Sequence, residues 1–137
     1  MPASPCAIWQ PHLLDHPNGA VALAEVGFCV ADVAATGEKL GRLLDLDWKE
    51  VMPGVARFTL PRGTIYVMNA AAMAKWTPGV TPPCIPCVAT VGFAVRDLDA
   101  TRGLLRENGV AYTDHPYPAL WIVPDYTCGP VISFIQA

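Results

Sequence analysis

The sequence predicts an α+β fold made of two βαβββ units, and three observations lead to this prediction. Residues 25–36 nearly recur at 90–101, with Val, Gly, Phe, Val, Asp, Ala and Thr in register, which indicates two copies of one supersecondary unit. Each copy begins with alternating apolar residues, as a strand requires, and continues with an aspartate and leucines at helical spacing. Three short apolar runs separated by turn residues then follow each expected helix.

The chain up to residue 69 contains an arm and the first unit. Residues 1–22, rich in proline, form an N-terminal arm that ends near the turn sequence His16-Pro-Asn-Gly19. Unit one covers 23–69, with its later strands separated by Pro-Gly and Pro-Arg-Gly turns. Its expected elements are a strand at 23–31, a helix at 33–46 capped by Asp32, and strands at 48–52, 55–60 and 64–69.

A linker at 70–87 joins the units and is a candidate lid, with a short helix at 70–76 and a proline-rich remainder. Unit two covers 88–137. Its expected elements are a strand at 88–96, a helix at 98–107 capped by Asp97, and strands at 110–113, 119–123 and 131–135. We expect one face of the two opening strands to pack against the two helices, through Val26, Phe28, Val30, Val91, Phe93 and Val95.

The composition is that of a globular protein, with 53% apolar and 15% charged residues. The 137 residues suffice for a single domain with its own core. A net charge of −3 disfavours a nucleic-acid surface, and no apolar run approaches the roughly 20 residues of a membrane span. The first residues do not resemble a signal peptide, so we expect a cytoplasmic protein.

Five cysteines cannot all pair within one chain, and thiols in the cytoplasm are mostly reduced. Cys84 and Cys87 form a Cys-x-x-Cys sequence, which is a redox or metal-binding pattern. The pair precedes an expected strand rather than a helix, however, which favours a purely structural role and leaves redox chemistry or metal binding as the alternative. The three histidines lie in proline-rich segments without the spacing of a metal motif.

Two βαβββ units of this length, each with a first strand ending in Val-x-Asp before a helix, resemble the vicinal oxygen chelate superfamily. This superfamily includes glyoxalase I, the bleomycin-resistance proteins and extradiol dioxygenases. The resemblance to a glyoxalase-like domain covers roughly residues 23–137. It implies curled mixed sheets around a cavity shared by the two units, with the helices outside, and it implies a homodimer.

In metal-dependent members of this superfamily, ligands come from the first and last strands of each unit. The first-strand positions fall on Glu25 and Thr90, and the last-strand positions fall near Tyr66 or Val67 and on Ser133. Only Glu25 is a good ligand for a divalent cation, which needs several histidine or carboxylate donors. We therefore expect no resident cofactor and no metal site, with a divalent metal as the disfavoured alternative.

Strand alternation places Gly27, Cys29, Thr90 and Gly92 on the same face as Glu25. Such small residues either leave room for a ligand or allow the two units to pack closely. Aromatic residues nearby are either ligand platforms or core residues, and His115 is expected near the cavity rim. The candidate ligand-binding residues are Glu25, Cys29, Tyr66, Trp76, Thr90, Trp121 and Ser133.

These observations favour a small-molecule binding protein with a degenerate metal site, which takes an apolar or cationic aromatic ligand between the units. The alternative is a glyoxalase-like lyase or isomerase, or a dioxygenase. In that alternative, Glu25 is the candidate catalytic residue, as a base or within an unusual metal site. We expect a small-molecule ligand as partner, and neither nucleic acid nor membrane.

Overall fold

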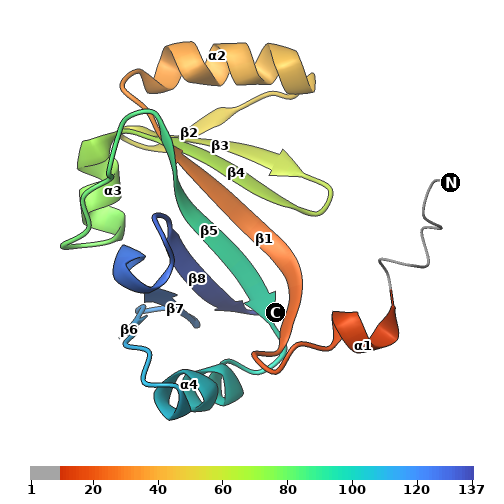
Figure 1. The fold of residues 1–137 in the computed structure, drawn as a ribbon. Helices are drawn as coiled ribbons and strands as arrows, with labels where there is room; N and C mark the ends of the chain where they lie inside the picture. Colours follow the sequence, from red (N-terminus) through yellow and green to blue (C-terminus); the bar gives the residue numbers. More distant parts are fainter. Residues whose placement is uncertain (1–9) are drawn as a thin grey trace, which may run out of the picture.

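The computed structural model describes residues 10–137 and confirms the α+β fold with two βαβββ units (Figure 1). The strands of unit one are β1 (Ala20–Cys29), β2 (Lys49–Met52), β3 (Val55–Leu60) and β4 (Gly63–Met68). Those of unit two are β5 (Cys87–Val95), β6 (Thr113–Asp114), β7 (Ala119–Ile122) and β8 (Val131–Gln136). The helices are α1 (Pro11–Leu14), α2 (Val33–Leu44), α3 (Ala70–Trp76) and α4 (Leu98–Glu107), with a 3-10 turn at Pro124–Tyr126.

All eight strands form one curled mixed sheet in the order β2-β3-β4-β1-β5-β8-β7-β6. In each unit the first strand pairs in parallel with the last, β1 with β4 and β5 with β8. The antiparallel pair of β1 with β5 joins the two units at the middle of the sheet. The strand order is therefore the same in both units when each is counted outward from this seam.

The repeated aspartates cap their helices as predicted. A side-chain oxygen of Asp32 accepts a hydrogen bond from the backbone N–H of Ala35 at 2.9 Å. Asp97 accepts from the backbone N–H groups of Asp99 and Ala100. These bonds satisfy amide groups that a helix leaves without partners at its first turn. The same residue type at the same place in the repeat thus begins both helices.

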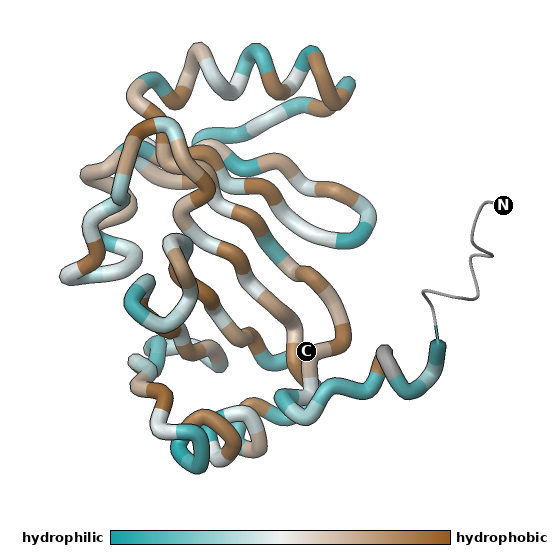
Figure 2. The backbone as a smooth tube through the Cα atoms, viewed as in Figure 1, coloured by the Kyte–Doolittle hydropathy of each residue, from teal (hydrophilic) through white to brown (hydrophobic). Residues whose placement is uncertain are grey.

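The two long helices cover opposite ends of the convex face of the sheet (Figures 1 and 2). Val30 and Phe58 are buried in an apolar cluster beneath α2, and Val95 and Phe134 in another beneath α4. Between the helices the central strands have no helical cover. This placement explains why Val26 and Val91 are only half-buried, where the sequence predicted burial against the helices. Phe28 and Phe93 were predicted to be buried as well, and they too are only partly buried, at the edges of the two clusters.

A third apolar cluster fills the opposite, concave face at one end. Met73 of α3 packs there against Met68 of β4 and Val131 of β8, and all three are almost fully buried. The short helix predicted at 70–76 therefore packs between the two units and closes part of the space between them. Trp76, at its C-terminal end, is only partly buried and lies at the edge of this cluster.

The N-terminal arm differs from the prediction in two respects. The first strand begins at Ala20 rather than at residue 23, and the arm contains the short helix α1. The predicted turn is present, with the N–H of Gly19 donating to the carbonyl of His16 at 2.9 Å. Thr101 of α4 then donates from its hydroxyl to the carbonyl of Asn18 at 2.8 Å, which fastens the end of the arm to unit two. No described helix has the length and apolar character needed to cross a membrane.

Candidate functional site

The strand register brings the predicted site positions together on the concave face. One row across the sheet contains Thr64, Glu25, Gly92, Ser133 and Trp121, each paired with the next on neighbouring strands. The adjacent row contains Tyr66, Gly27, Thr90 and Val131. Side chains two residues apart on a strand point to the same face, so both rows face the same space. Glu25, Thr90, Tyr66 and Ser133 therefore meet at the seam between the units.

The two repeated glycines accommodate side chains from the opposite unit. A methyl group at Gly27 would overlap the hydroxyl of Thr90, and a methyl group at Gly92 would overlap the side chain of Glu25. Each glycine thus leaves room for the residue that occupies the other repeat's first-strand position. At these two positions the small residues serve close packing between the units, which was one of the two readings of the sequence.

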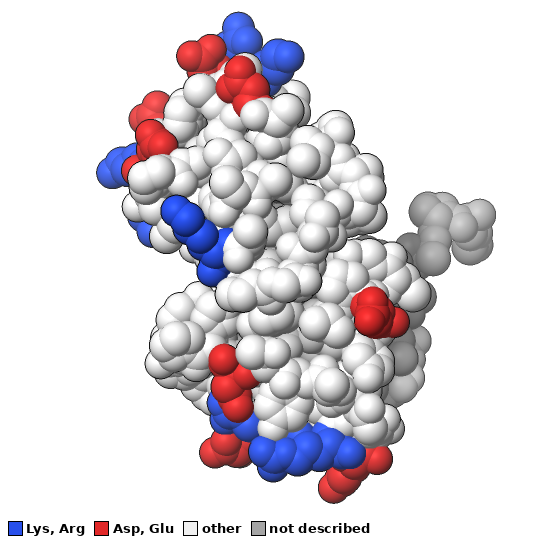
Figure 3. Space-filling view, turned by 90° about the vertical axis from the view of Figure 1, so that its left-hand side faces the viewer, with Lys and Arg blue, Asp and Glu red and all other residues white. Residues whose placement is uncertain are grey.

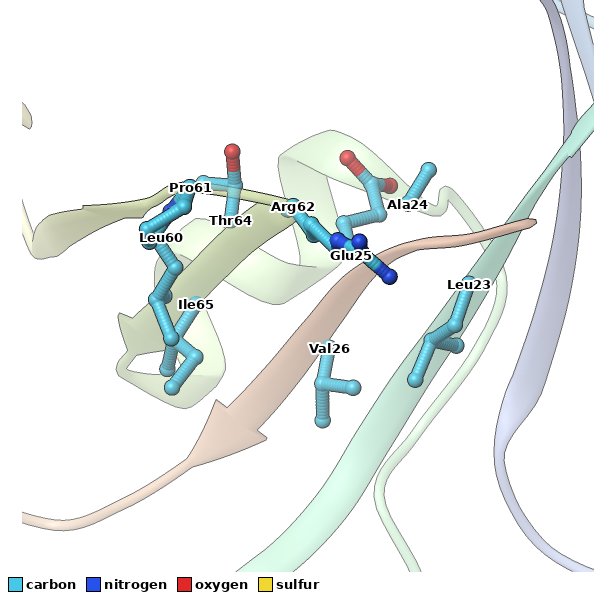
Figure 4. Close-up of a pocket in the computed structure, with 10 residues that line it drawn as sticks. Leu23, Ala24, Glu25, Val26, Leu60, Pro61, Arg62, Thr64 and Ile65 are labelled. Atoms are coloured by element: carbon cyan, nitrogen blue, oxygen red, sulfur yellow. The ribbon is translucent and has the colours of Figure 1, made fainter. Parts of the chain in front are cut away.

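Glu25 is a half-buried carboxyl without a charged partner among residues 10–137. Its carboxylate and the hydroxyl of Thr64 point to one side of the sheet, while Leu23, Val26 and Ile65 point to the other (Figure 4). Burial raises the pKa of Glu25 above its ordinary value, because desolvation penalises the charged form. Ionised Glu25 here lacks the compensation that a salt bridge would supply.

Aromatic residues surround this carboxyl. Burial raises the pKa of Tyr66 and of Tyr117, and the nearby negative charge of Glu25 raises both further. Tyr66 contacts Trp76 edge-on, with ring centroids 4.9 Å apart. The side chain of Trp76 also hydrogen-bonds to Tyr117, which favours the phenolate and offsets part of the rise in the pKa of that tyrosine. The two tyrosines and the tryptophan thus form one connected wall beside Glu25.

A hollow of about 310 Å³ opens at this wall, lined by Met52, Ala72, Lys75, Trp76, His115 and Tyr117. The rings of His115 and Tyr117 stack with centroids 4.4 Å apart. Burial lowers the pKa of His115, so its imidazole is neutral at physiological pH. Its Nδ1 atom is buried and has no hydrogen-bond partner among the described residues.

The remaining predicted residues lie around the seam at different depths. Cys29 has no exposed surface and Trp121 is 6% exposed, both within the concave-face cluster beneath α3. Ser133 is half-buried beside Gly92. Tyr117 was absent from the sequence-predicted set. Its one signal was its place in the segment 115–118, where aromatic residues alternate with prolines.

The donor set at the four metal-ligand positions does not fit a divalent cation. Glu25 supplies one carboxylate, whereas Thr90, Tyr66 and Ser133 supply neutral hydroxyl groups. Zinc, calcium and related ions are held in proteins by several carboxylate, imidazole or thiolate ligands. In the part of the chain that the structure describes, no three His, Cys, Asp or Glu side chains converge as a metal site.

A second hollow lies on the convex face, and its lining is more apolar than the region around Glu25 on the concave face. It has a volume of about 510 Å³ and is lined mainly by apolar residues, among them Leu23, Val26, Leu60 and Ile65 (Figure 4). Glu25, Arg62 and Thr64 also belong to its lining. The carboxylate of Glu25 points away from these apolar residues. Polar anchoring groups therefore gather on the concave face. On the side shown in Figure 3, charged side chains concentrate over α2 and α4, and the band between them is largely uncharged.

Comparison with known proteins yields matches among solved structures. No family model and no curated protein sequence matches the chain. Methylmalonyl-CoA epimerase from Mycobacterium tuberculosis superposes with a TM-score of 0.63 at 22% identity, covering 86% of this chain and 89% of that one. A hypothetical protein from Bacillus halodurans superposes with a TM-score of 0.61 at 17% identity, covering 84% of this chain and 93% of that one.

A methylmalonyl-CoA epimerase from Streptomyces coelicolor, in complex with 2-nitronate-propionyl-CoA, has a TM-score of 0.57 at 17% identity and covers 86% of this chain and 98% of its own. At these identities the likeness concerns the fold, not the activity. It agrees with the internal repeat, the strand order and the position of the helices. The chain therefore has the same paired βαβββ fold as these epimerases, which is the fold that its resemblance to the vicinal oxygen chelate superfamily implied.

Proposed function

We propose that the protein binds a small cationic or apolar aromatic molecule in a groove on the concave face, formed by the hollow at the Tyr66–Trp76–Tyr117 wall and the space beside Glu25, with Glu25 as its polar anchor. The observation that carries this proposal is a half-buried carboxyl, without an ion-pair partner among the described residues, beside an aromatic wall. A desolvated carboxylate is costly when ionised. A cationic ligand removes that cost by supplying the missing counter-charge.

The aromatic wall suits the same ligand class. Trp76, Tyr66 and Tyr117 present aromatic surface close to Glu25, and the faces of such rings attract cations. The adjoining hollow of about 310 Å³ lies at the lower end of the range for small-molecule sites, so the ligand is small or partly exposed. Lys75 also lines the hollow but is exposed, so its ammonium can turn toward solvent.

Titration with a cationic aromatic dye such as ethidium, followed by tryptophan fluorescence, tests this proposal. We expect Glu25→Gln, which keeps the shape and removes the charge, to weaken dye binding by about tenfold or more. The matched control is Glu38→Gln, because Glu38 is an exposed glutamate on α2, away from the groove. Equal affinities for wild type and Glu25→Gln would reject Glu25 as the anchor.

A second candidate function is proton transfer at a carbon acid, as in an epimerase, isomerase or lyase. The raised pKa of Glu25 favours it, because a general base works best with a pKa near the operating pH. In such a reaction Glu25 would take a proton from carbon, and an epimerisation would be completed when solvent or a second acid protonates the opposite face of the resulting carbanion. The solved neighbours named methylmalonyl-CoA epimerase make their substrate the first compound to test.

Deuterium exchange separates the two functions. The protein is incubated with methylmalonyl-CoA in D2O, and mass spectrometry measures deuterium incorporation at the α-carbon. Incorporation that disappears in Glu25→Gln but persists in Glu38→Gln would establish the catalytic function. Dye binding that depends on Glu25, together with no deuterium exchange above background, would reject the catalytic function for this substrate and support the binding function.

A further inference from the structure

The Cys-x-x-Cys sequence places two thiols in contact at the start of β5. Cys84 lies in the linker before the strand and is exposed, whereas Cys87 is the first residue of β5 and is half-buried. The two side chains are hydrogen-bonded to each other. The Cys84 Sγ also lies 3.7 Å from the carbonyl oxygen of Pro86, to which it donates. The intervening turn thus folds Cys84 back onto Cys87.

A third cysteine lies behind this pair. Cys29 ends β1, is paired with Cys87 across the seam, and has no exposed surface. Backbone hydrogen bonds from Cys84 and Cys29 reach the Cys87 thiol. Solvent therefore meets an exposed thiol first, then a half-buried one, and then a fully buried one.

We propose that Cys84 and Cys87 form a redox-active dithiol that is oxidised to an intramolecular disulfide by small-molecule disulfides. Cys84 is the attacking thiol, because it is exposed and the other two are not. Cys87 is the resolving thiol, because it already contacts the Cys84 side chain. This assignment is independent of the ligand groove and of the role of Glu25.

The exchange has two balanced steps. The Cys84 thiolate attacks one sulfur of the small disulfide, which forms a mixed disulfide and releases the first small thiolate. The Cys87 thiol then loses its proton as it attacks the Cys84 sulfur, which forms the Cys84–Cys87 bond and releases the second small thiolate. The two released thiolates take up the protons that the cysteines lost, and two electrons pass from the dithiol to the small disulfide.

The surroundings support this division of roles. Burial raises the pKa of Cys29, and the neighbouring Cys87 thiol raises it further. Burial also raises the pKa of Cys87, and the charge of the neighbouring Cys84 raises it further. Cys87 and Cys29 therefore stay protonated at neutral pH and are poor first nucleophiles. Contact between Cys84 and Cys87 lets the second step occur without opening of the strand.

Peptide mapping of the whole protein tests the proposal directly. Trypsin cleaves after Lys75 and Arg96 and at no residue between them, so residues 76–96 form one peptide that contains Cys84 and Cys87 and no other cysteine. After treatment with glutathione disulfide and blocking of free thiols, we expect this peptide to be unblocked and lighter by two hydrogen atoms. The same peptide blocked at both cysteines would overturn the proposal.

Single variants test the order of the two thiols. Cys87→Ser should trap Cys84 as a mixed disulfide with glutathione, and Cys84→Ser should lower adduct formation on the 76–96 peptide by about tenfold or more. Cys128 is also exposed but lies in the connection between β7 and β8, outside the 76–96 peptide, so Cys128→Ser is the matched control and should leave the wild-type disulfide unchanged. Equal adduct yields in Cys87→Ser and Cys84→Ser, or a disulfide that requires Cys128, would refute the assignment.

Discussion

Replacement of Gly27 by alanine tests the packing of the two units at the seam. The added methyl group would overlap the Thr90 hydroxyl and lie 3.1 Å from the end of the Met68 side chain. Overpacking of this kind costs about 1–3 kcal/mol. The Thr90 hydroxyl belongs to a buried side chain on the paired strand and has little freedom to move. With an unfolding slope of about 2 kcal/mol per molar urea, a loss of 2 kcal/mol lowers the midpoint by about 1 M.

A second substitution, Thr90→Ala, completes a double-mutant cycle and removes the overlap with the hydroxyl. Thr90→Ala deletes the hydroxyl, and the nearest remaining Thr90 atom, its Cβ, then lies at an ordinary contact distance of 3.5 Å. We expect the double variant to be more stable than the sum of the single effects by about 1–2 kcal/mol. Urea unfolding of all four proteins measures this coupling. Gly103→Ala is the control, because it adds a methyl group to α4 with no atom within 4 Å and should be neutral or stabilising.

The packing argument fails if Gly27→Ala is as stable as the wild-type protein. It also fails if the two effects add to within about 0.3 kcal/mol, because independent sites behave in that way. An unchanged unfolding slope across the four proteins is needed for the comparison, since a changed slope signals a changed folded or denatured state.

Three further predictions concern the core, the arm and the candidate site. Phe58→Ala should cost about 3–5 kcal/mol in urea unfolding, because Phe58 has no exposed surface; a cost below about 1 kcal/mol would place it outside the core. Thr101→Val should cost about 1–2 kcal/mol, because the Asn18 carbonyl loses its partner, and an unchanged midpoint would show that this bond contributes nothing. Burial raises the pKa of Glu25 above 4.5, so the folded state holds the proton of this carboxyl more tightly than the unfolded chain does. The stability that Glu25 contributes is therefore lost as the pH rises from 4.5 through the folded pKa. Glu25→Gln should flatten that fall in urea melts at several pH values, and identical slopes would contradict the burial of its charge.

Most of the fold could be predicted because the same strand–cap–helix pattern occurs twice in the sequence, at 25–36 and at 90–101. The two aspartate caps and the apolar alternation of β1 and β5 are local signals, and the structure contains both. The beginning of β1 at Ala20 was missed because register shifts near Ala20 and Leu23 break the alternation there. The half-exposure of Val26 was also missed, because it depends on where α2 and α4 end over the sheet rather than on the strand's own sequence.

Strand alternation predicted the strand-borne part of the candidate site, whereas Trp76 and His115 were named without a periodic pattern and Tyr117 was not named. Alternation alone placed Glu25 and Thr90 on one face, and the register confirms that both lie at the seam. Tyr117 and His115 reach the site from the connection between β6 and β7, whose course follows from tertiary packing rather than from any periodic pattern. Loops carry such residues without a local signal, so single-sequence reasoning places them poorly.

The β1–β5 seam has a consequence for the chain as an assembly of two halves. Within the described residues, these two strands form the ladder by which the halves of the sheet join, and each would be an edge strand without the other. Unpaired edges of nine or ten residues template pairing with a second chain. A half-chain that dimerised through this edge would rebuild the same eight-stranded order. A gene duplication followed by fusion therefore accounts for the repeat, and cleavage within the 77–87 linker should yield two fragments that reassemble by strand complementation.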